Sequence, residues 1–131
     1  MNGWIAQEIK LSGANQAVAA SQTKQVVSED TRFTFGGATK QLRVDVTAAS
    51  VTAGAGITFA LQHTSDGSTW SDVGAPKTTS ITGNGEFSLL WNGDVAADAA
   101  YMPFKTRFRV VCTTGAGSAV TFTSIRALME V

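Results

Sequence analysis

The sequence predicts an all-β fold, an antiparallel β-sandwich of eight or more short strands with almost no helix. Two observations predict it. Apolar residues alternate with polar ones in most segments, which is the period of two of a strand with one buried face. Glycine-containing turns separate these segments at short intervals. A jelly-roll topology is favoured over an immunoglobulin-like one, because the Cys–Trp–Cys pattern of true immunoglobulin domains is absent.

The first third of the chain is expected to contain short strands before a longer one. Ile5, Ile9 and Leu11 share one parity, which predicts a short edge strand or an extended arm. One domain is expected to span residues 1–131, and residues 1–20 are the part of it that would form an extended N-terminal arm. Three further strands are expected in this region: 23–28, 32–35 and 41–47.

The clearest structural signal is a β-hairpin over residues 57–73. Apolar and polar residues alternate through its first strand, and Asp66-Gly67 supplies the turn, because both residues tolerate the backbone conformations of a tight hairpin. The preceding segment, 48–56, contains two glycines and only one large apolar residue, and it is predicted to be a loop.

The register of this hairpin follows from its chemistry. A three-residue loop, 66–68, opposes Leu61 to Val73 and Gln62 to Asp72, so that each face is consistent. A loop of two or four residues would place a carboxylate opposite Leu61 instead. In the preferred register Trp70 lies on the polar face with Gln62, where it should be covered by a loop, an arm, another subunit or a ligand.

Two more hairpins and one irregular segment complete the chain. The hairpins are predicted to pair 77–82 with 86–91 around Gly83-Asn84-Gly85, and 104–113 with 120–131 around Gly115-Ala116-Gly117. The apolar parity switches after Phe122, which predicts a β-bulge near Thr123-Ser124. Residues 92–103 look irregular, with one short helical turn within 95–100.

Composition excludes several classes of partner. Charged residues make up 15% of the chain, below the roughly 25% that is typical of soluble domains. Lysine plus arginine equal aspartate plus glutamate, and there is no basic run, so neither nucleic acid nor an anionic membrane is an expected partner. The single Cys112 rules out an internal disulfide. The N-terminus lacks the pattern of a signal peptide, and no stretch is long enough to span a membrane.

No constellation for catalysis is recognised, so the chain is predicted not to be an enzyme. His63 is the only histidine, and no serine lies in a nucleophile-elbow sequence. Cys112 shares the apolar face of its strand, where a cysteine behaves as a small hydrophobic residue. Asp66 and Asp72 flank a turn that offers too few oxygen ligands for a calcium loop. No catalytic, cofactor-binding or metal-binding residue is therefore predicted.

The candidate functional residues are instead aromatic and charged residues that suit an interface. They are Trp4 and Ile5 near the N-terminus, Trp70 and Asp72 beside the central turn, and Arg107 and Arg109 on the polar face of the last hairpin. A basic row of this kind faces solvent, pairs with acids, or guides docking against a large acidic assembly.

Three stretches resemble the small capsid cement, or decoration, proteins of tailed bacteriophages. They are Val51–Gly67, Tyr101–Thr114 with its Phe-Arg-Val-Val strand, and Gly115–Val131. The resemblance implies a jelly-roll-like virion protein without an active site or cofactor. It also implies a homo-oligomer, made in the host cytoplasm, that binds the major capsid protein on the outside of the head and stabilises the shell through symmetric contacts.

Two alternatives remain open from the residues themselves. One is a phage tail or fibre subunit, which has the same composition and fold class. The other is a carbohydrate-binding or adhesin module that uses Trp70 together with Asp66 and Asp72.

Overall fold

Strands make up nearly all of the regular structure in the computed structural model, which describes residues 4–12, 16–21, 23–32, 41–74, 77–99 and 107–130. The elements are β1 (Trp4–Glu8), β2 (Gln16–Val18), β3 (Gln25–Val26), β4 (Thr31–Arg32), β5 (Gln41–Thr52), β6 (Ile57–Thr64), β7 (Ser71–Asp72), β8 (Thr78–Ser80), β9 (Gly85–Asn92), α1 (Ala96–Ala99), β10 (Arg107–Thr114) and β11 (Ala119–Glu130). The predicted helical turn within 95–100 is confirmed by α1. Most of the strand expected over 32–35 lies outside the described residues.

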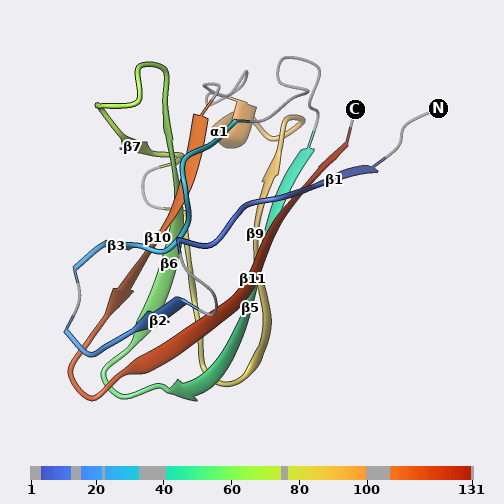
Figure 1. Cartoon of the computed structure of the whole chain (residues 1–131). Helices are drawn as coiled ribbons and strands as arrows, with labels where there is room; N and C mark the ends of the chain where they lie inside the picture. Colours follow the sequence, from blue (N-terminus) through green and yellow to red (C-terminus); the bar gives the residue numbers. More distant parts are fainter. Residues whose placement is uncertain are drawn as a thin grey trace.

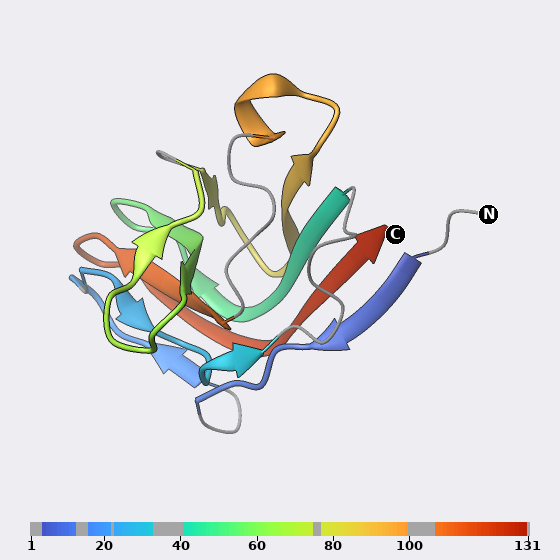
Figure 2. The ribbon, with the colours of Figure 1, turned by 90° about the horizontal axis from the view of Figure 1, so that it is seen from above.

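The strands form two antiparallel sheets that pack face to face (Figures 1 and 2). Sheet I has the order β1-β11-β5-β9, and β2 also pairs with β11. Sheet II has the order β3-β10-β6-β7, with β4 also on β10 and β8 also on β6. The predicted antiparallel β-sandwich is therefore confirmed.

The connections between the strands are those of a jelly roll. β1 and β2 lie one after the other along β11, and β3 with β4 and β7 with β8 do the same along β10 and β6. When each such pair is counted as one interrupted strand, the described residues form eight strands, the number found in a jelly roll. Every connection except the one from β6 to β7 then crosses from one sheet to the other.

Two of the three predicted hairpins are wrong. β8 pairs with β6 in sheet II while β9 pairs with β5 in sheet I, so the turn at 83–85 crosses between sheets. β10 pairs with β6 and β11 pairs with β5, so the turn at 115–117 crosses as well. The apolar residues of each predicted strand pair instead lie on opposite sheets, and their inner faces border one common core. Alternation and a glycine turn are equally compatible with both arrangements.

The central hairpin has the predicted register. Gln62 is opposite Asp72, and the Val73 N–H donates to the Leu61 carbonyl oxygen at 2.9 Å. The loop is longer than predicted, since the ladder ends at the pair of His63 and Ser71. The extra residues make room for the folded turn described below.

The N-terminal segment pairs with β11, the strand that runs through the middle of sheet I. β1 aligns with residues 126–130 of β11, as the edge-strand alternative predicted. Ile9 follows it into the core, and its N–H donates to the Ile125 carbonyl oxygen at 2.9 Å.

Two irregularities mark the ladder between β5 and β11. The predicted bulge is confirmed, because the register shifts between Phe122 and Ser124. The loop predicted from residue 48 is wrong at its start, since β5 continues to Thr52. A second register shift lies opposite Ser50, whose φ of 50° is rare for a residue with a side chain.

The core fills the space between the two sheets and draws on both inner faces. Its largest fully buried side chains include Trp91, Phe59, Phe108, Phe122, Ile9 and Leu42. β9, β11 and β5 supply three of these from sheet I, whereas β6 and β10 supply two from sheet II. Burial of these side chains is the main stabilising contribution to the sandwich.

The turns from β5 to β6 and from β10 to β11 lie against each other at one end of the sandwich. The Ala55 N–H donates to the Ala116 carbonyl oxygen at 3.0 Å, and the Gly115 N–H donates to that of Gly56 at 2.8 Å. The Ser118 hydroxyl, which is buried, lies 2.6 Å from the Ala53 carbonyl oxygen. These contacts hold together two turns that each join one sheet to the other.

β9 forms one edge of sheet I, and side chains occupy part of its outer backbone. The Thr79 hydroxyl donates to the Ser88 carbonyl oxygen at 2.8 Å, and the Lys77 ammonium donates to that of Leu90 at 2.7 Å. The Asn92 N–H donates to an Asp98 carboxylate oxygen at 3.0 Å.

Candidate functional site

Polar side chains gather on the outer face of sheet II, the face turned away from the core. Odd-numbered residues of β10 and even-numbered residues of β6 point outward, because successive side chains of a strand alternate between faces. The registers place Arg32, Arg107 and Thr64 in one row across the strands, and Arg109, Gln62 and Asp72 in the next. The third row consists of Val26, Val111, Ala60 and Thr78.

A chain of contacts runs across this face and is called here the Trp70 cluster: Trp70, Arg109, Gln62, Asp72 and Lys24. The Arg109 guanidinium carbon lies 4.3 Å from the centre of the Trp70 ring. Arg109 Nε donates to Gln62 Oε1 at 2.9 Å, and Gln62 Nε2 donates to Asp72 Oδ1 at 2.9 Å. The Lys24 ammonium completes the chain at 3.1 Å from Asp72 Oδ2. Each polar side chain of the cluster therefore holds the next in one orientation.

Lys24 crosses the sheet to reach this cluster. Its backbone N–H donates to the Thr113 hydroxyl, whereas its ammonium pairs with Asp72 two rows away. The aliphatic part of its side chain must therefore pass over the row that contains Val111 and Ala60, and both of these are buried although they face outward. Lysine here covers apolar surface and supplies a charge.

Charge within the cluster is only partly balanced. Although burial raises the pKa of Asp72, hydrogen bonds from Gln62 and Lys24 outweigh it and hold the pKa below its usual value. Asp72 is thus ionised at neutral pH and balances Lys24. Burial lowers the pKa of Arg109, yet arginine remains charged at any physiological pH.

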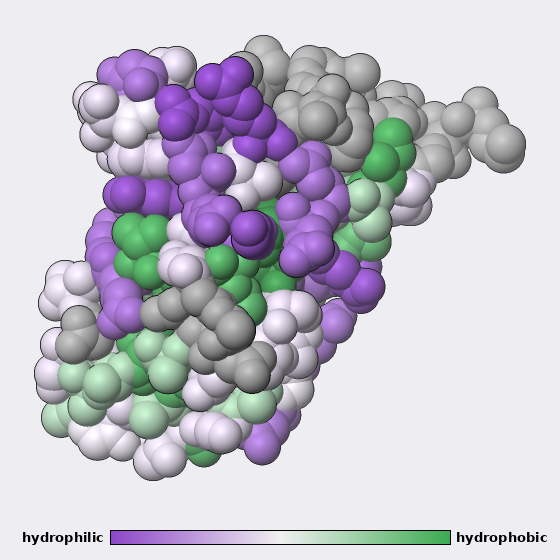
Figure 3. All heavy atoms as spheres, in the orientation of Figure 1, coloured by the Kyte–Doolittle hydropathy of each residue, from purple (hydrophilic) through white to green (hydrophobic). Residues whose placement is uncertain are grey.

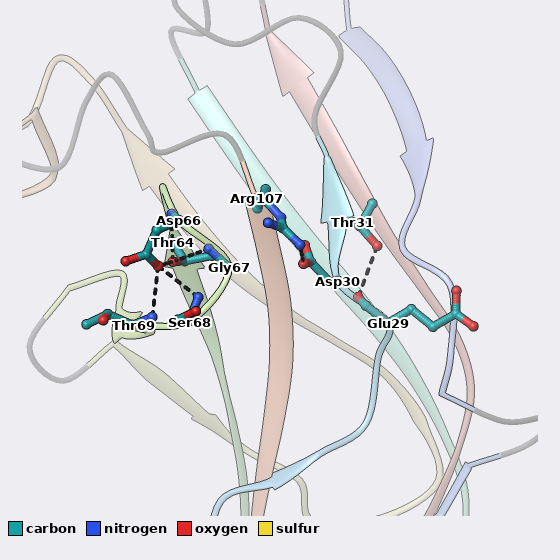
Figure 4. A network of polar contacts seen from close by, with 9 residues as sticks. All are labelled: Glu29, Asp30, Thr31, Thr64, Asp66, Gly67, Ser68, Thr69 and Arg107. Atoms are coloured by element: carbon teal, nitrogen blue, oxygen red, sulfur yellow. Dashed lines mark hydrogen bonds and ion pairs between the residues drawn. The ribbon is translucent and has the colours of Figure 1, made fainter.

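The loop between β6 and β7 is folded around the Asp66 carboxylate (Figure 4). Its Oδ1 accepts hydrogen bonds from the backbone N–H groups of Ser68 at 2.8 Å and Thr69 at 2.9 Å, and from the Thr64 hydroxyl at 2.9 Å. These bonds lower the pKa of Asp66 from 3.8 to about 2. The loop that delivers Trp70 to the outer face is therefore ordered by hydrogen bonds to this carboxylate and to the Thr64 hydroxyl, which accepts from the Asp66 and Gly67 N–H groups.

Arg107 supports the same loop from the side of β10 (Figure 4). Its guanidinium lies against Gly67 and forms an ion pair with Asp30. Gly67 has a φ of 81°, and a side chain there would meet the guanidinium. Arg107 thus pairs with an acid, one of the outcomes predicted for the basic row, whereas its neighbour Arg109 contacts an aromatic ring and an amide.

We expect wild-type protein to lose more stability in acid than Asp66→Asn. Because the folded-state pKa of Asp66 lies below its ordinary value, its contribution is present above about pH 3.8 and is lost as the pH falls toward 2. The test is the urea midpoint of both proteins between pH 6 and 2, with wild type falling more steeply. Asp72 and Asp98, whose pKa values are also lowered, are common to both proteins and cancel in the comparison. Parallel curves would contradict the role given to Asp66.

The remaining sequence candidates lie elsewhere. Trp4 is 48% exposed and is opposite Glu130 at the end of β1, on sheet I, while Ile5 is half-buried opposite Met129. The structure thus brings together Trp70, Asp72, Arg107 and Arg109 but not the two N-terminal residues. Sequence reasoning missed two residues of the site. Gln62 could have been found, because the alternation of its strand places it on the polar face with Trp70. Lys24 had no local signal in the sequence.

His63 and Cys112, the two side chains considered for catalysis, are both buried in the protein. His63 is buried with its ring centre 6.1 Å from that of Phe108. Burial raises the pKa of the Cys112 thiol to about 12, so the reactive thiolate is not formed near neutral pH. Within the described ranges, no group of three or more His, Cys, Asp and Glu residues is placed to hold a metal ion.

A groove of about 740 Å³ lies between the segment 6–12 and residues 123–126 of β11. Figure 3 shows apolar side chains gathered in the middle of the face that β1 crosses, bordered by hydrophilic ones. Glu8, Lys10, Glu29 and Arg126 give the groove both signs of charge. It contains none of the residues of the Trp70 cluster. In the part of the chain that is described, no helix has the length and apolar character needed to cross a membrane.

Comparison with known proteins assigns no family to the chain. No protein-family model matches the sequence, and no curated protein matches it. A solved structure described as a xylan-binding module, CBM15, is similar to the chain with a TM-score of 0.44 and 12% sequence identity, over 97% of each chain.

Proposed function

We propose that this chain is a non-catalytic carbohydrate-binding module that binds its ligand on the outer face of sheet II. The observation that carries the proposal is the Trp70 ring, held by Arg109 beside Gln62 and Asp72. Aromatic rings contact the apolar faces of sugars, and nearby amide and carboxylate groups bind sugar hydroxyls. The Trp70 cluster combines these groups within two neighbouring rows of one sheet.

Preorganisation supports this assignment. Trp70 is half-buried with Arg109 over one face of its ring, so the residue keeps exposed surface that a ligand could contact. Its loop is fixed by the Asp66 turn, and the side chains beside it are already hydrogen-bonded to one another. These side chains are already ordered in the folded protein. Binding a ligand would therefore cost little additional side-chain entropy, which favours affinity.

Binding should depend on Trp70. We expect at least one glycan of a broad panel to bind wild-type protein, and Trp70→Ala to weaken that binding by about tenfold or more, since aromatic anchors dominate such contacts. Trp4→Ala is the matched control, because Trp4 lies on the other sheet and is 48% exposed. Isothermal titration calorimetry measures both variants without relying on tryptophan fluorescence. Equal losses in the two variants, or no binding to any glycan, would reject the proposal.

Attachment to a virus head, implied by the resemblance to decoration proteins, stays a prediction. It differs from the carbohydrate proposal in the partner, which would be the major capsid protein, and in the expected homo-oligomer. Quantitative mass spectrometry of purified particles separates the two. A copy number equal to that of the shell protein, or a simple fraction of it, would favour decoration, and a few copies would favour a tail or fibre subunit.

A further inference from the structure

Arg109 differs in its partners from three other arginines of the sandwich. Arg43, Arg107 and Arg126 each form an ion pair with a carboxylate. Among the residues that the structure describes, no carboxylate lies within ion-pair distance of Arg109. Its described contacts are the Gln62 amide oxygen and the Trp70 ring, neither of which carries a charge.

The surroundings leave this positive charge unbalanced. Lys24 is balanced by Asp72, and Arg107 is balanced by Asp30. Asp30 also attracts Arg109, but it is already paired with Arg107. Among the described residues, the remaining charges near this face are Asp66 in the loop and the exposed Arg32, which are of opposite sign. The charge of Arg109 therefore remains in excess in the middle of the candidate site.

Partial burial makes this charge well suited to a ligand. Arg109 is half-buried under Trp70, and burial lowers its pKa, which is the sign of a cation that has lost part of its hydration. A carboxylate that reaches such a guanidinium gains more than it would at a fully hydrated one. One N–H, at Nε, is used by Gln62, whereas the guanidinium has five in all.

We propose that the ligand of this site is an acidic saccharide, and that Arg109 binds the carboxylate of a uronate residue in it. The inference rests on the proposed carbohydrate-binding function. A uronate carries a planar carboxylate on the sugar ring, and the fork of guanidinium N–H groups matches that geometry with two parallel hydrogen bonds. The sugar ring would contact Trp70 while its carboxylate meets the rim of the guanidinium, and Asp72, held by Gln62 and Lys24, would accept from sugar hydroxyls.

The test compares acidic oligosaccharides with their neutral counterparts on the wild-type protein. Oligogalacturonates and oligomannuronates are titrated by calorimetry, alongside the same oligosaccharides after chemical reduction of the carboxyl groups. We expect at least one acidic form to bind about tenfold or more tightly than its reduced form. Dextran sulfate oligomers of similar charge density should bind no better than the reduced sugars.

Variants assign the preference to one residue. Arg109→Met keeps an unbranched chain beneath Trp70 and should abolish the preference for the acidic form, whereas Arg109→Lys should retain part of it. Arg32→Met is the matched control, since it removes an exposed positive charge from the neighbouring row and should leave the preference intact. Thermal unfolding confirms that each variant is folded, and the wild-type comparison needs no variant.

Each other outcome overturns a defined part of the argument. Equal binding of acidic and reduced forms, or binding confined to neutral glycans, would overturn the recognition of a carboxylate and leave the carbohydrate module standing. Equal effects of Arg109→Met and Arg32→Met, or strong binding of dextran sulfate, would show general attraction of anions instead. The absence of binding to any saccharide, acidic or neutral, would reject both proposals.

Discussion

Replacing Trp91 by alanine is expected to lower the free energy of unfolding by about 3–5 kcal/mol. Trp91 has no exposed surface and is the largest of the fully buried side chains. It lies on β9, opposite Leu42, and its indole N–H donates to the Val73 carbonyl oxygen at 3.2 Å. Its loss would open a cavity between the sheets and remove a contact from sheet I to the strand end beyond β7.

The control for this prediction is the same substitution at Trp4. Trp4 is 48% exposed at an edge strand, so Trp4→Ala should change stability by less than about 0.5–1 kcal/mol. Urea unfolding followed by far-UV circular dichroism measures both variants by one method. If the two losses are similar, Trp91 does not contribute to the core as its burial indicates. Should Trp91→Ala fail to fold, Trp91→Phe keeps most of the volume and should lose less.

The second large effect is expected at Gly54, in the turn between β5 and β6. Gly54 has a φ of 52°, which costs a residue with a side chain about 1–2 kcal/mol. An alanine Cβ there would lie 2.5 Å from the Gly117 carbonyl carbon and 2.7 Å from the Ala116 carbonyl oxygen. Since these are backbone atoms, the two turns would have to separate and lose the hydrogen bonds between them. We expect Gly54→Ala to destabilise the protein by about 2–4 kcal/mol in all.

Gly83→Ala separates crowding at this point from the general effect of replacing glycine. Gly83 also lies in a turn between the sheets, but nothing surrounds the position of its Cβ and its φ is not positive. Its replacement should leave the urea midpoint unchanged or raise it slightly, because alanine reduces the entropy of the unfolded chain. A Gly54→Ala protein as stable as Gly83→Ala would mean that the two turns are not in contact.

Sequence reasoning was accurate for local patterns and failed where two strands had to be assigned to a sheet. The hairpin register rested on a chemical conflict, because a loop of two or four residues would have placed a carboxylate opposite Leu61, and the register is correct. For the turns at 83–85 and 115–117 no such conflict existed. Ile81 and Leu89, for example, are buried on the inner face whether their strands pair in one ladder or lie in opposite sheets. Whether two such strands pair or lie in opposite sheets is decided by the other strands that each one pairs with, and those lie far away in the sequence.

The same distinction explains the candidate site. Trp70 and Asp72 were found because both lie in one hairpin, where the alternation of side chains fixes the face. Arg107 and Arg109 were found as a row, but their partners, Asp30 and Trp70, come from other segments. Lys24 reaches Asp72 from 48 residues away, across the width of the sheet. A contact of this kind has no trace in local composition.

The occupied edge of β9 limits how copies of this protein can join. At this edge a strand from another molecule could extend sheet I only by pairing with the outer backbone of β9, where the carbonyl oxygens of Ser88 and Leu90 are already bonded to side chains. The other three sheet edges are each split into two short strands, which offer no long template. Strand addition at these edges is therefore disfavoured, which favours assembly through side-chain contacts over growth of fibrils.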